Sequence, residues 1–149
     1  MEKYAQYAKE IPIRSGVGSF ETGAIMDGQF LGVDSLAIRY GLVNKTGMIE
    51  EETPLQHTHD YDQMLWFLST EPDDMISLDA EVEFTMGEEL IRQRLDNPSA
   101  ILIPKGTPHF SPIVTRLGKP FFFLAVSSAG SFHADVADPD AKPDAGPWG

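Results

Sequence analysis

The sequence predicts an all-β protein organised as one sandwich or barrel. Short apolar segments separated by turn residues dominate the chain, whereas a helical or βαβ fold would need longer segments with helical periodicity. The length of 149 residues matches one domain. A hydrophobic content of 42%, with nine Phe, is enough for one compact core.

Eight segments are predicted as strands because each is a short apolar or alternating run between turn residues. In residues 80–86 apolar and polar residues alternate, so one side faces a core and the other faces solvent or a polar cavity. The predicted strands are residues 36–43, 53–59, 63–68, 80–86, 89–95, 100–104, 109–115 and 121–127.

Turn residues separate these segments. Gly28 and Gly87 are expected to supply positive φ, while Pro98 and residues 118–120 interrupt strand pairing. The one helical candidate is residues 2–9, where apolar residues fall at helical spacing ahead of a proline.

The chain divides into three parts in this interpretation. Residues 1–35 are expected to form N-terminal strands or an arm, residues 36–127 a barrel, and residues 128–149 an extended tail rich in Pro, Gly and Asp. An ordered tail of this composition needs a surface to lie on. We therefore hypothesise that Trp148 packs on the barrel or on a neighbouring subunit.

Composition excludes several classes of function. With 11 Lys and Arg against 23 Asp and Glu, the net charge of −12 disfavours nucleic acid and anionic lipid as partners, and otherwise indicates solubility. The absence of Cys excludes disulfides, thiolate metal sites and a cysteine nucleophile. No signal sequence is recognised and no apolar run approaches roughly 20 residues, so a cytoplasmic location is expected.

Three of the four histidines fall in two short segments. On an extended strand, residues two apart share a face, so His57 and His59 present both imidazoles to one side at a spacing that a metal can bridge. If residues 60–62 form a hairpin turn, Gln63 lies across from this pair and offers its amide oxygen to the same ion. Taken alone, such a histidine pair is more often incidental than a pair of metal ligands.

The second segment begins at Pro104 and ends at His109. Pro104 ends a strand, Gly106 permits a sharp bend and Pro108 stiffens the exit, which aims His109 inward. A third histidine in an all-β context favours a metal site over satisfied barrel histidines. His133, in the tail, is expected to be structural or on the surface.

The two segments resemble the two motifs of the cupin superfamily, His-x-His followed after three or four residues by Glu, and Pro-x-Gly-x-x-His. The matching residues are His57, His59, Gln63, Pro104, Gly106 and His109. The resemblance covers residues 36–127 and implies a double-stranded β-helix, or jelly-roll, barrel with one metal held by the three histidines. It also implies a homodimer, with which an apolar edge strand such as residues 121–126 would be consistent.

The sequence departs from the family pattern at several positions. Gln63 replaces the family's Glu, Glu51 and Thr70 replace flanking glycines of the first motif, Pro98 replaces the opening glycine of the second, and Ile113 replaces its terminal Asn. Gln63 is expected either to be a weaker fourth ligand or to hydrogen-bond a metal-bound water.

The neutral donor set has chemical consequences. Three imidazoles and an amide leave the full charge of a divalent ion in the site, which favours an anionic, oxygen-chelating substrate. Nitrogen-rich ligation suits transition metals better than Mg or Ca, so the expected cofactor is one divalent ion of Zn, Fe, Ni, Mn, Co or Cu.

The walls of the site and its acid-base groups are less defined. Large apolar residues are expected in the core, and one or two of them could shape a pocket: Met64, Trp66, Phe84, Met86 and residues 121–123. The polar candidates are Tyr61, Tyr40, Arg39, Glu81, Glu83, Arg92 and Arg94. The last four are expected to form a solvated strand face, unless an inward Arg anchors a substrate carboxylate.

Two functional hypotheses follow from the resemblance. The first is a metal-dependent cupin enzyme of the dioxygenase, isomerase, lyase or decarboxylase type, acting on a small organic substrate. The alternative is a non-catalytic small-molecule binding or sensing cupin, because a fold does not fix function. A third interpretation is a barrel with a degenerate site.

Overall fold

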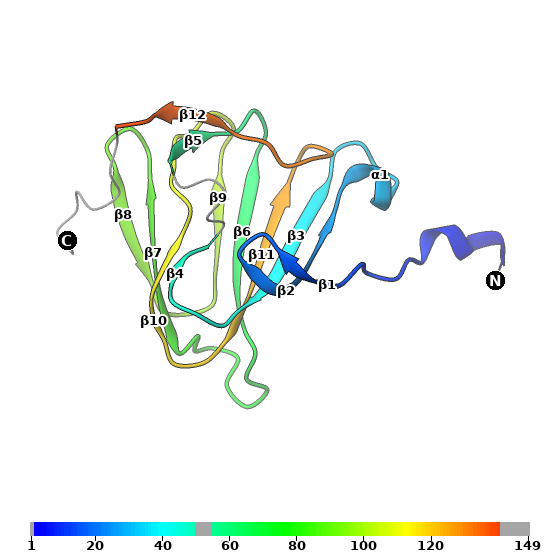
Figure 1. Ribbon diagram of the computed structural model, residues 1–149, viewed down its shortest axis with the longest axis horizontal. Helices are drawn as coiled ribbons and strands as arrows, with labels where there is room; N and C mark the ends of the chain where they lie inside the picture. The colour runs from blue at the N-terminus through cyan, green and yellow to red at the C-terminus, as the bar shows by residue number, and fades with distance from the viewer. Residues whose placement is uncertain (1, 50–54, 141–149) are drawn as a thin grey trace.

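The computed structural model describes residues 2–49 and 55–140. Two antiparallel sheets face each other, and two short strands lie across one end of the molecule (Figure 1). The elements are η1 (Glu2–Tyr7), β1 (Arg14–Val17), β2 (Phe20–Met26), α1 (Gly28–Leu31), β3 (Ala37–Val43), β4 (Gly47–Met48), β5 (Gln56–Thr58), β6 (Gln63–Ser69), β7 (Ala80–Met86), β8 (Ile91–Leu95), β9 (Ser99–Ile103), β10 (Ile113–Leu117), β11 (Phe121–Ser127) and β12 (Asp135–Asp138).

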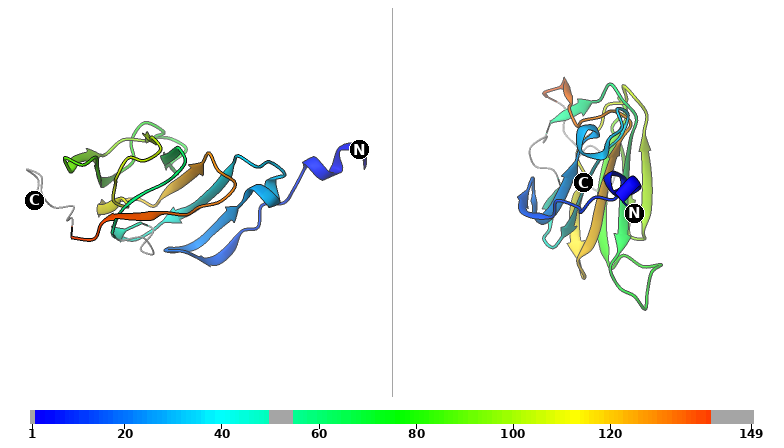
Figure 2. Two further views of the ribbon diagram at one scale, coloured as in Figure 1. Left: turned by 90° about the horizontal axis from the view of Figure 1, so that it is seen from above. Right: turned by 90° about the vertical axis from the view of Figure 1, so that its right-hand side faces the viewer.

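The strand order joins distant parts of the chain. The larger sheet runs β1-β2-β3-β11-β6-β9 and the smaller runs β4-β10-β7-β8, while β12 pairs with β5. The view from above shows the two sheets as separate layers (Figure 2). This arrangement confirms the predicted all-β class.

The core lies between the two sheets, on the faces that period-two alternation assigns to it. In β7 the side chains of Ala80, Val82 and Phe84 are buried, and in β11 those of Phe121 and Phe123 are buried. Because adjacent strands present these residues in register, the aromatic rings meet directly: Phe67 lies 5.5 Å from Phe123 between ring centroids. The predicted alternation is confirmed for residues 80–84, but Thr85, expected on the polar side, is buried as well, with 3% of its surface exposed.

Most predicted strand bounds hold to within one or two residues, but two predictions are wrong. Residues 109–115 do not form one strand: β10 begins at Ile113, after Pro112, and His109 makes only isolated bridges. Residues 121–126 are not an edge strand either, because β11 lies between β3 and β6. For the predicted strand 53–59, residues 53 and 54 lie outside the described residues.

The helical and turn predictions have mixed outcomes. The candidate at residues 2–9 is a 3-10 helix, η1, rather than an α-helix. Gly28 does not have the expected positive φ: Asp27 caps α1 by accepting a hydrogen bond from the Phe30 amide at 2.8 Å. Gly87 does adopt positive φ, at 88°, in the turn between β7 and β8.

The C-terminal region is partly structured by pairing. β12 forms an antiparallel ladder with β5, with Val136 opposite His57. Trp148 lies outside the described residues, so its packing stays a hypothesis. Within the described residues, no helix has both the length and the apolar character needed to span a membrane.

Candidate functional site

His57 lies in β5, His59 directly follows that strand, and His109 lies in the segment between β9 and β10. Backbone hydrogen bonds join the two segments. His57 and His109 form an isolated antiparallel bridge in which each amide donates to the other's carbonyl, at 2.9 and 3.0 Å. The Gly106 amide also donates to the carbonyl of His59 at 2.9 Å. The turn that follows β9 is therefore attached to the His57–His59 segment by backbone hydrogen bonds, which do not depend on side-chain packing.

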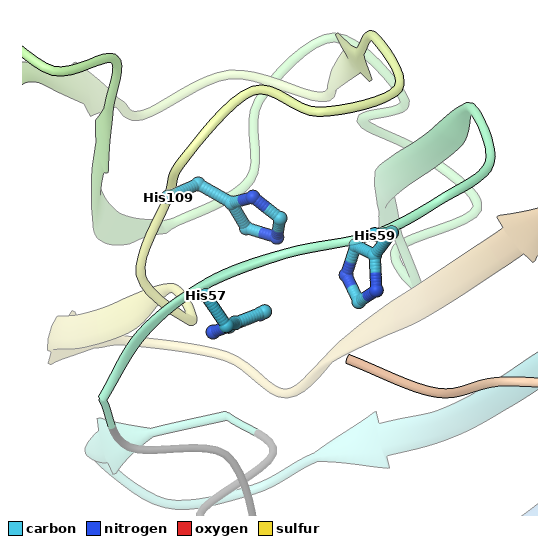
Figure 3. Close-up of side chains that lie close together, drawn as sticks. All are labelled: His57, His59 and His109. Carbon is cyan, nitrogen blue, oxygen red and sulfur yellow. The ribbon is translucent and has the colours of Figure 1, made fainter. Parts of the chain in front are cut away.

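The imidazole rings gather around one region of the interior, as Figure 3 shows. Ring centroids of His57 and His109 are 4.3 Å apart, those of His59 and His109 are 4.9 Å apart, and those of His57 and His59 are 5.1 Å apart. One nitrogen from each ring lies within 4.8 Å of the others. All three residues are buried, with at most 9% of their surface exposed. The predicted convergence of these imidazoles is confirmed.

Each ring is anchored through its Nδ1 atom by a backbone carbonyl. His57 Nδ1 lies 2.8 Å from the Leu55 carbonyl oxygen, His59 Nδ1 lies 2.6 Å from that of His133, and His109 Nδ1 lies 3.0 Å from that of Thr107. A carbonyl oxygen can only accept, so each Nδ1 carries the proton. The Nε2 atom of each neutral ring is therefore unprotonated and can act as a metal ligand.

Burial keeps these rings neutral. Desolvation, with a smaller contribution from the charge of His57, lowers the pKa of His109 to about 3, against the raising effect of the Thr107 carbonyl. Desolvation likewise lowers the pKa values of His57 and His59 below the ordinary 6.5. At neutral pH the three rings are thus in the protonation state that metal binding requires.

Gln63 joins the cluster from the start of β6. Its side chain is buried, and it lies near enough to the ring of His59 to influence the pKa of that ring. In the sheet it lies opposite Ser127 of β11 and Ile103 of β9, so it stands at the end of the inner face that is nearest the histidine loops. The structure therefore brings the predicted fourth residue next to His59.

Tyr61, a polar candidate from the sequence, and His133 contact this site in ways that the sequence did not indicate. Tyr61 stacks on His59, with ring centroids 4.8 Å apart, and its hydroxyl donates to the His133 carbonyl at 3.0 Å and accepts from the His133 amide at 3.2 Å. The ring of His133 contacts Asp60 through Nε2. His133 is half-exposed, as expected, but its main chain holds the ring of His59, which local sequence patterns do not indicate.

The remaining polar candidates have other partners. Arg94 lies 3.6 Å from Glu81 and Arg92 lies 3.7 Å from Glu83, between guanidinium nitrogen and carboxylate oxygen, on β7 and β8. The side chain of Arg92 is only 4% exposed, so the expected solvated face is wrong at this position. Arg39 lies over the ring of Phe132, with 4.9 Å between guanidinium carbon and ring centroid.

The donor set fits a transition metal. Three neutral imidazole nitrogens with carbonyl-anchored Nδ1 atoms are the arrangement in which histidine ligands are found, and no carboxylate joins the cluster among the described residues. Phe84 lies beside His109, with 6.1 Å between ring centroids, and gives the site an apolar wall.

Comparison with known proteins gives the fold. The sequence matches no family model and no curated protein. Among solved structures, two single-substitution variants of the oxalate decarboxylase of Bacillus subtilis are both 16% identical, with TM-scores of 0.55 and 0.56 over 83% and 86% of this chain. A structure described for its Mn(II) centres in the same enzyme is 14% identical, with a TM-score of 0.56 over 89% of this chain.

This chain spans 29%, 30% and 36% of the length of those three structures. Oxalate decarboxylase is a cupin. The likeness, the antiparallel sheets and the placement of the histidine loops show that this chain has the cupin double-stranded β-helix, or jelly-roll, fold.

The buried neutral histidines predict a pH dependence of stability. The pKa of His109 is lower in the folded state than in the unfolded state, so protonation favours unfolding. The associated stability is present above about pH 6.5 and is lost as the pH falls towards 3. In metal-free protein we expect His109→Asn to reduce the slope of unfolding free energy against pH in this window, by up to about 1.4 kcal/mol per pH unit.

Urea unfolding at a series of pH values measures this slope. His133→Asn, which removes a half-exposed ring outside the buried cluster together with its contact to Asp60, is measured in parallel. Equal slopes for wild type and His109→Asn would contradict the assignment of a neutral, buried His109.

Proposed function

We propose that His57, His59 and His109 bind one divalent transition metal through their Nε2 atoms, with the Gln63 amide oxygen as a weaker fourth ligand. The observation that carries this proposal is the shared anchoring of the three rings. Each Nδ1 donates a hydrogen bond to a backbone carbonyl, which leaves the three Nε2 atoms available as metal ligands in one buried region. Histidines that only fill a hydrophobic core do not need the same ring nitrogen to be held by a carbonyl in every case.

The metal is one of Zn, Fe, Ni, Mn, Co or Cu, because imidazole-rich ligation without thiolates suits these ions. The Mn(II) centres named for the structurally similar oxalate decarboxylase are consistent with this class. A divalent ion bound here would act as a Lewis acid towards an oxygen ligand, with its full charge uncompensated by the protein's ligands.

We propose that the protein is a metal-dependent cupin enzyme for a small, anionic, oxygen-chelating substrate. The neutral donor set supports an anionic ligand, because the chain's own residues leave the site's positive charge for the substrate to neutralise. Phe84 would supply an apolar wall to the site. Oxalate, named for the similar structures, belongs to this chemical class. The reaction would be of the decarboxylase, lyase, isomerase or dioxygenase type.

We also propose a homodimer located in the cytoplasm. The cupin resemblance supports the dimer, and the net charge of −12 supports the absence of nucleic-acid and anionic-membrane partners. The cupin resemblance covers residues 36–127, and it supports the proposed division into an N-terminal part of residues 1–35, a barrel of residues 36–127 and a tail of residues 128–149.

Loss of a histidine should abolish metal binding. We expect wild type to take up one equivalent of metal, and His57→Ala or His109→Ala to weaken binding by more than about a hundredfold, because each removes a ligand. Elemental analysis and calorimetric titration with Mn²⁺, Zn²⁺ and Co²⁺ measure this. His133→Asn is the control and should retain metal, since the carbonyl that anchors His59 remains. Wild type that takes up less than about a tenth of an equivalent would contradict the proposal.

Gln63→Glu tests the fourth position. A carboxylate there would add a negative charge beside the ion, so we expect metal affinity to rise by about tenfold or more. Gln63→Leu should lower it by a smaller factor. The same titrations measure both variants. If both variants bind metal as tightly as wild type, Gln63 neither coordinates the ion nor hydrogen-bonds to a ligand of the ion.

A substrate panel tests the enzymatic proposal. We expect metal-loaded protein to turn over at least one small dicarboxylate, diketone or catechol, with oxalate as the first choice, and His57→Ala to be inactive. Carbon dioxide release, oxygen uptake and product analysis by NMR cover the reaction types. Tight binding of such a ligand without turnover by any of these readouts would contradict an enzyme and assign a binding module instead.

A further inference from the structure

A cavity lies beside the segment that carries His57. It has a volume of about 230 Å³ and is bounded by the turn between β7 and β8, the start of β5 and the end of β12, which lie at the same end of the molecule (Figure 1). The described residues that line it are Gln56, Glu88, Leu90, Pro108, Ala137 and Asp138. None of the three clustered histidines is among them, so this cavity is separate from the proposed metal site.

The side-chain amide of Gln56 points into this cavity. Gln56 is only 5% exposed, and successive side chains of an extended strand point to opposite sides, so its amide faces away from the ring of His57. Among the described residues, none forms a hydrogen bond with this amide. Buried side-chain amides in native proteins nearly always have a hydrogen-bond partner, so the one that Gln56 lacks within the protein is expected from a molecule in the cavity.

The charged groups of the cavity are acidic. Glu88 lies on the turn between β7 and β8, and Asp138 lies opposite Gln56 in the register of β12 and β5. One oxygen of Asp138 accepts a hydrogen bond from the Asp140 amide at 3.0 Å. No Lys or Arg is among the described residues that line the cavity. Two carboxylates without a basic neighbour favour a cation as the ligand.

The other walls favour an organic cation over a metal ion. Leu90, Pro108 and Ala137 contribute apolar surface, and the volume is close to the lower limit of roughly 300 Å³ for small-molecule sites. Among the described residues, no group of three acidic or histidine side chains gathers here at the spacing of metal ligands. The walls are held by backbone hydrogen bonds, from the Gly87 amide to the Pro108 carbonyl at 2.7 Å and from the Leu90 amide to the Gly87 carbonyl at 3.1 Å.

We propose that this cavity binds a small primary ammonium compound with a short apolar chain. The ammonium group has three donors, which match the carboxylates of Glu88 and Asp138 and the amide oxygen of Gln56. The carbon chain lies against Leu90 and Pro108. The site goes beyond the proposed metal-dependent function and does not depend on it, because none of these residues is a proposed metal ligand.

An NMR titration of the metal-free full chain with propylammonium chloride, at constant ionic strength, tests this site. We expect saturable shifts of the Gln56 side-chain amide and of the backbone amides of Gly87 and Leu90, with a dissociation constant on the order of a millimolar. Glu88→Gln and Asp138→Asn should each raise this constant about fivefold, the effect of losing one exposed charge pair. Gln56→Leu should raise it as well, with circular dichroism to verify its fold.

The matched control is Glu89→Gln, which removes the same charge from the same turn at an exposed residue that does not line the cavity. It should leave the dissociation constant unchanged, and uncharged propanol should not bind. The absence of saturable shifts, equal constants for Glu88→Gln and Glu89→Gln, or equal binding of propanol would overturn the proposal. Ca²⁺ that saturates the same shifts at a lower concentration than propylammonium would overturn the organic cation and assign a metal site instead.

Discussion

The reciprocal backbone hydrogen bonds between His57 and His109 are the constraint on which the site depends. They fix the distance between two loops that are some fifty residues apart in sequence, and the Gly106 amide extends the attachment to His59. Because the contacts involve main-chain atoms, a change of side chain in the cluster leaves the loops in place. The backbone of the β-helix thus fixes where the site lies, and the side chains at these positions determine its chemistry.

The sequence could predict the parts of this arrangement that follow from local geometry. Period-two alternation identified β7 and its buried face, and the same rule gave the shared direction of His57 and His59. The Pro104 to His109 turn gave the inward direction of the third ring. The strand expected to start at His109 fails for an equally local reason, since Pro112 has no amide hydrogen for a ladder and β10 starts only after it.

Contacts between distant, polar segments could not be predicted in this way. Tyr61 and His133 are 72 residues apart. They contact each other through the Tyr61 hydroxyl, the His133 carbonyl and amide, and an edge-to-face packing of their rings with centroids 5.1 Å apart. β12 has an exposed, acidic sequence without the apolar alternation of a strand. It forms because the backbone of β5 offers an unpaired edge, and any sequence without proline at the bonding positions can pair there. The position of β11 in the middle of its sheet is a matter of topology, which its apolar composition does not reveal.

The link between His59 and His133 has a consequence for the whole C-terminal region. A ring whose Nδ1 donates to a carbonyl becomes a better donor at Nε2, and a cation at Nε2 in turn strengthens the Nδ1 hydrogen bond. With the proposed metal bound at Nε2, the free energy of metal binding and the free energy of docking residues 131–138 would be coupled, since each state would stabilise the other. Tyr61 would strengthen this coupling, because its hydroxyl holds the carbonyl and amide of His133 in place while its ring packs on the ring of His59. The segment across the end of the barrel is by this reasoning part of the site's construction, although it contributes no ligand to it.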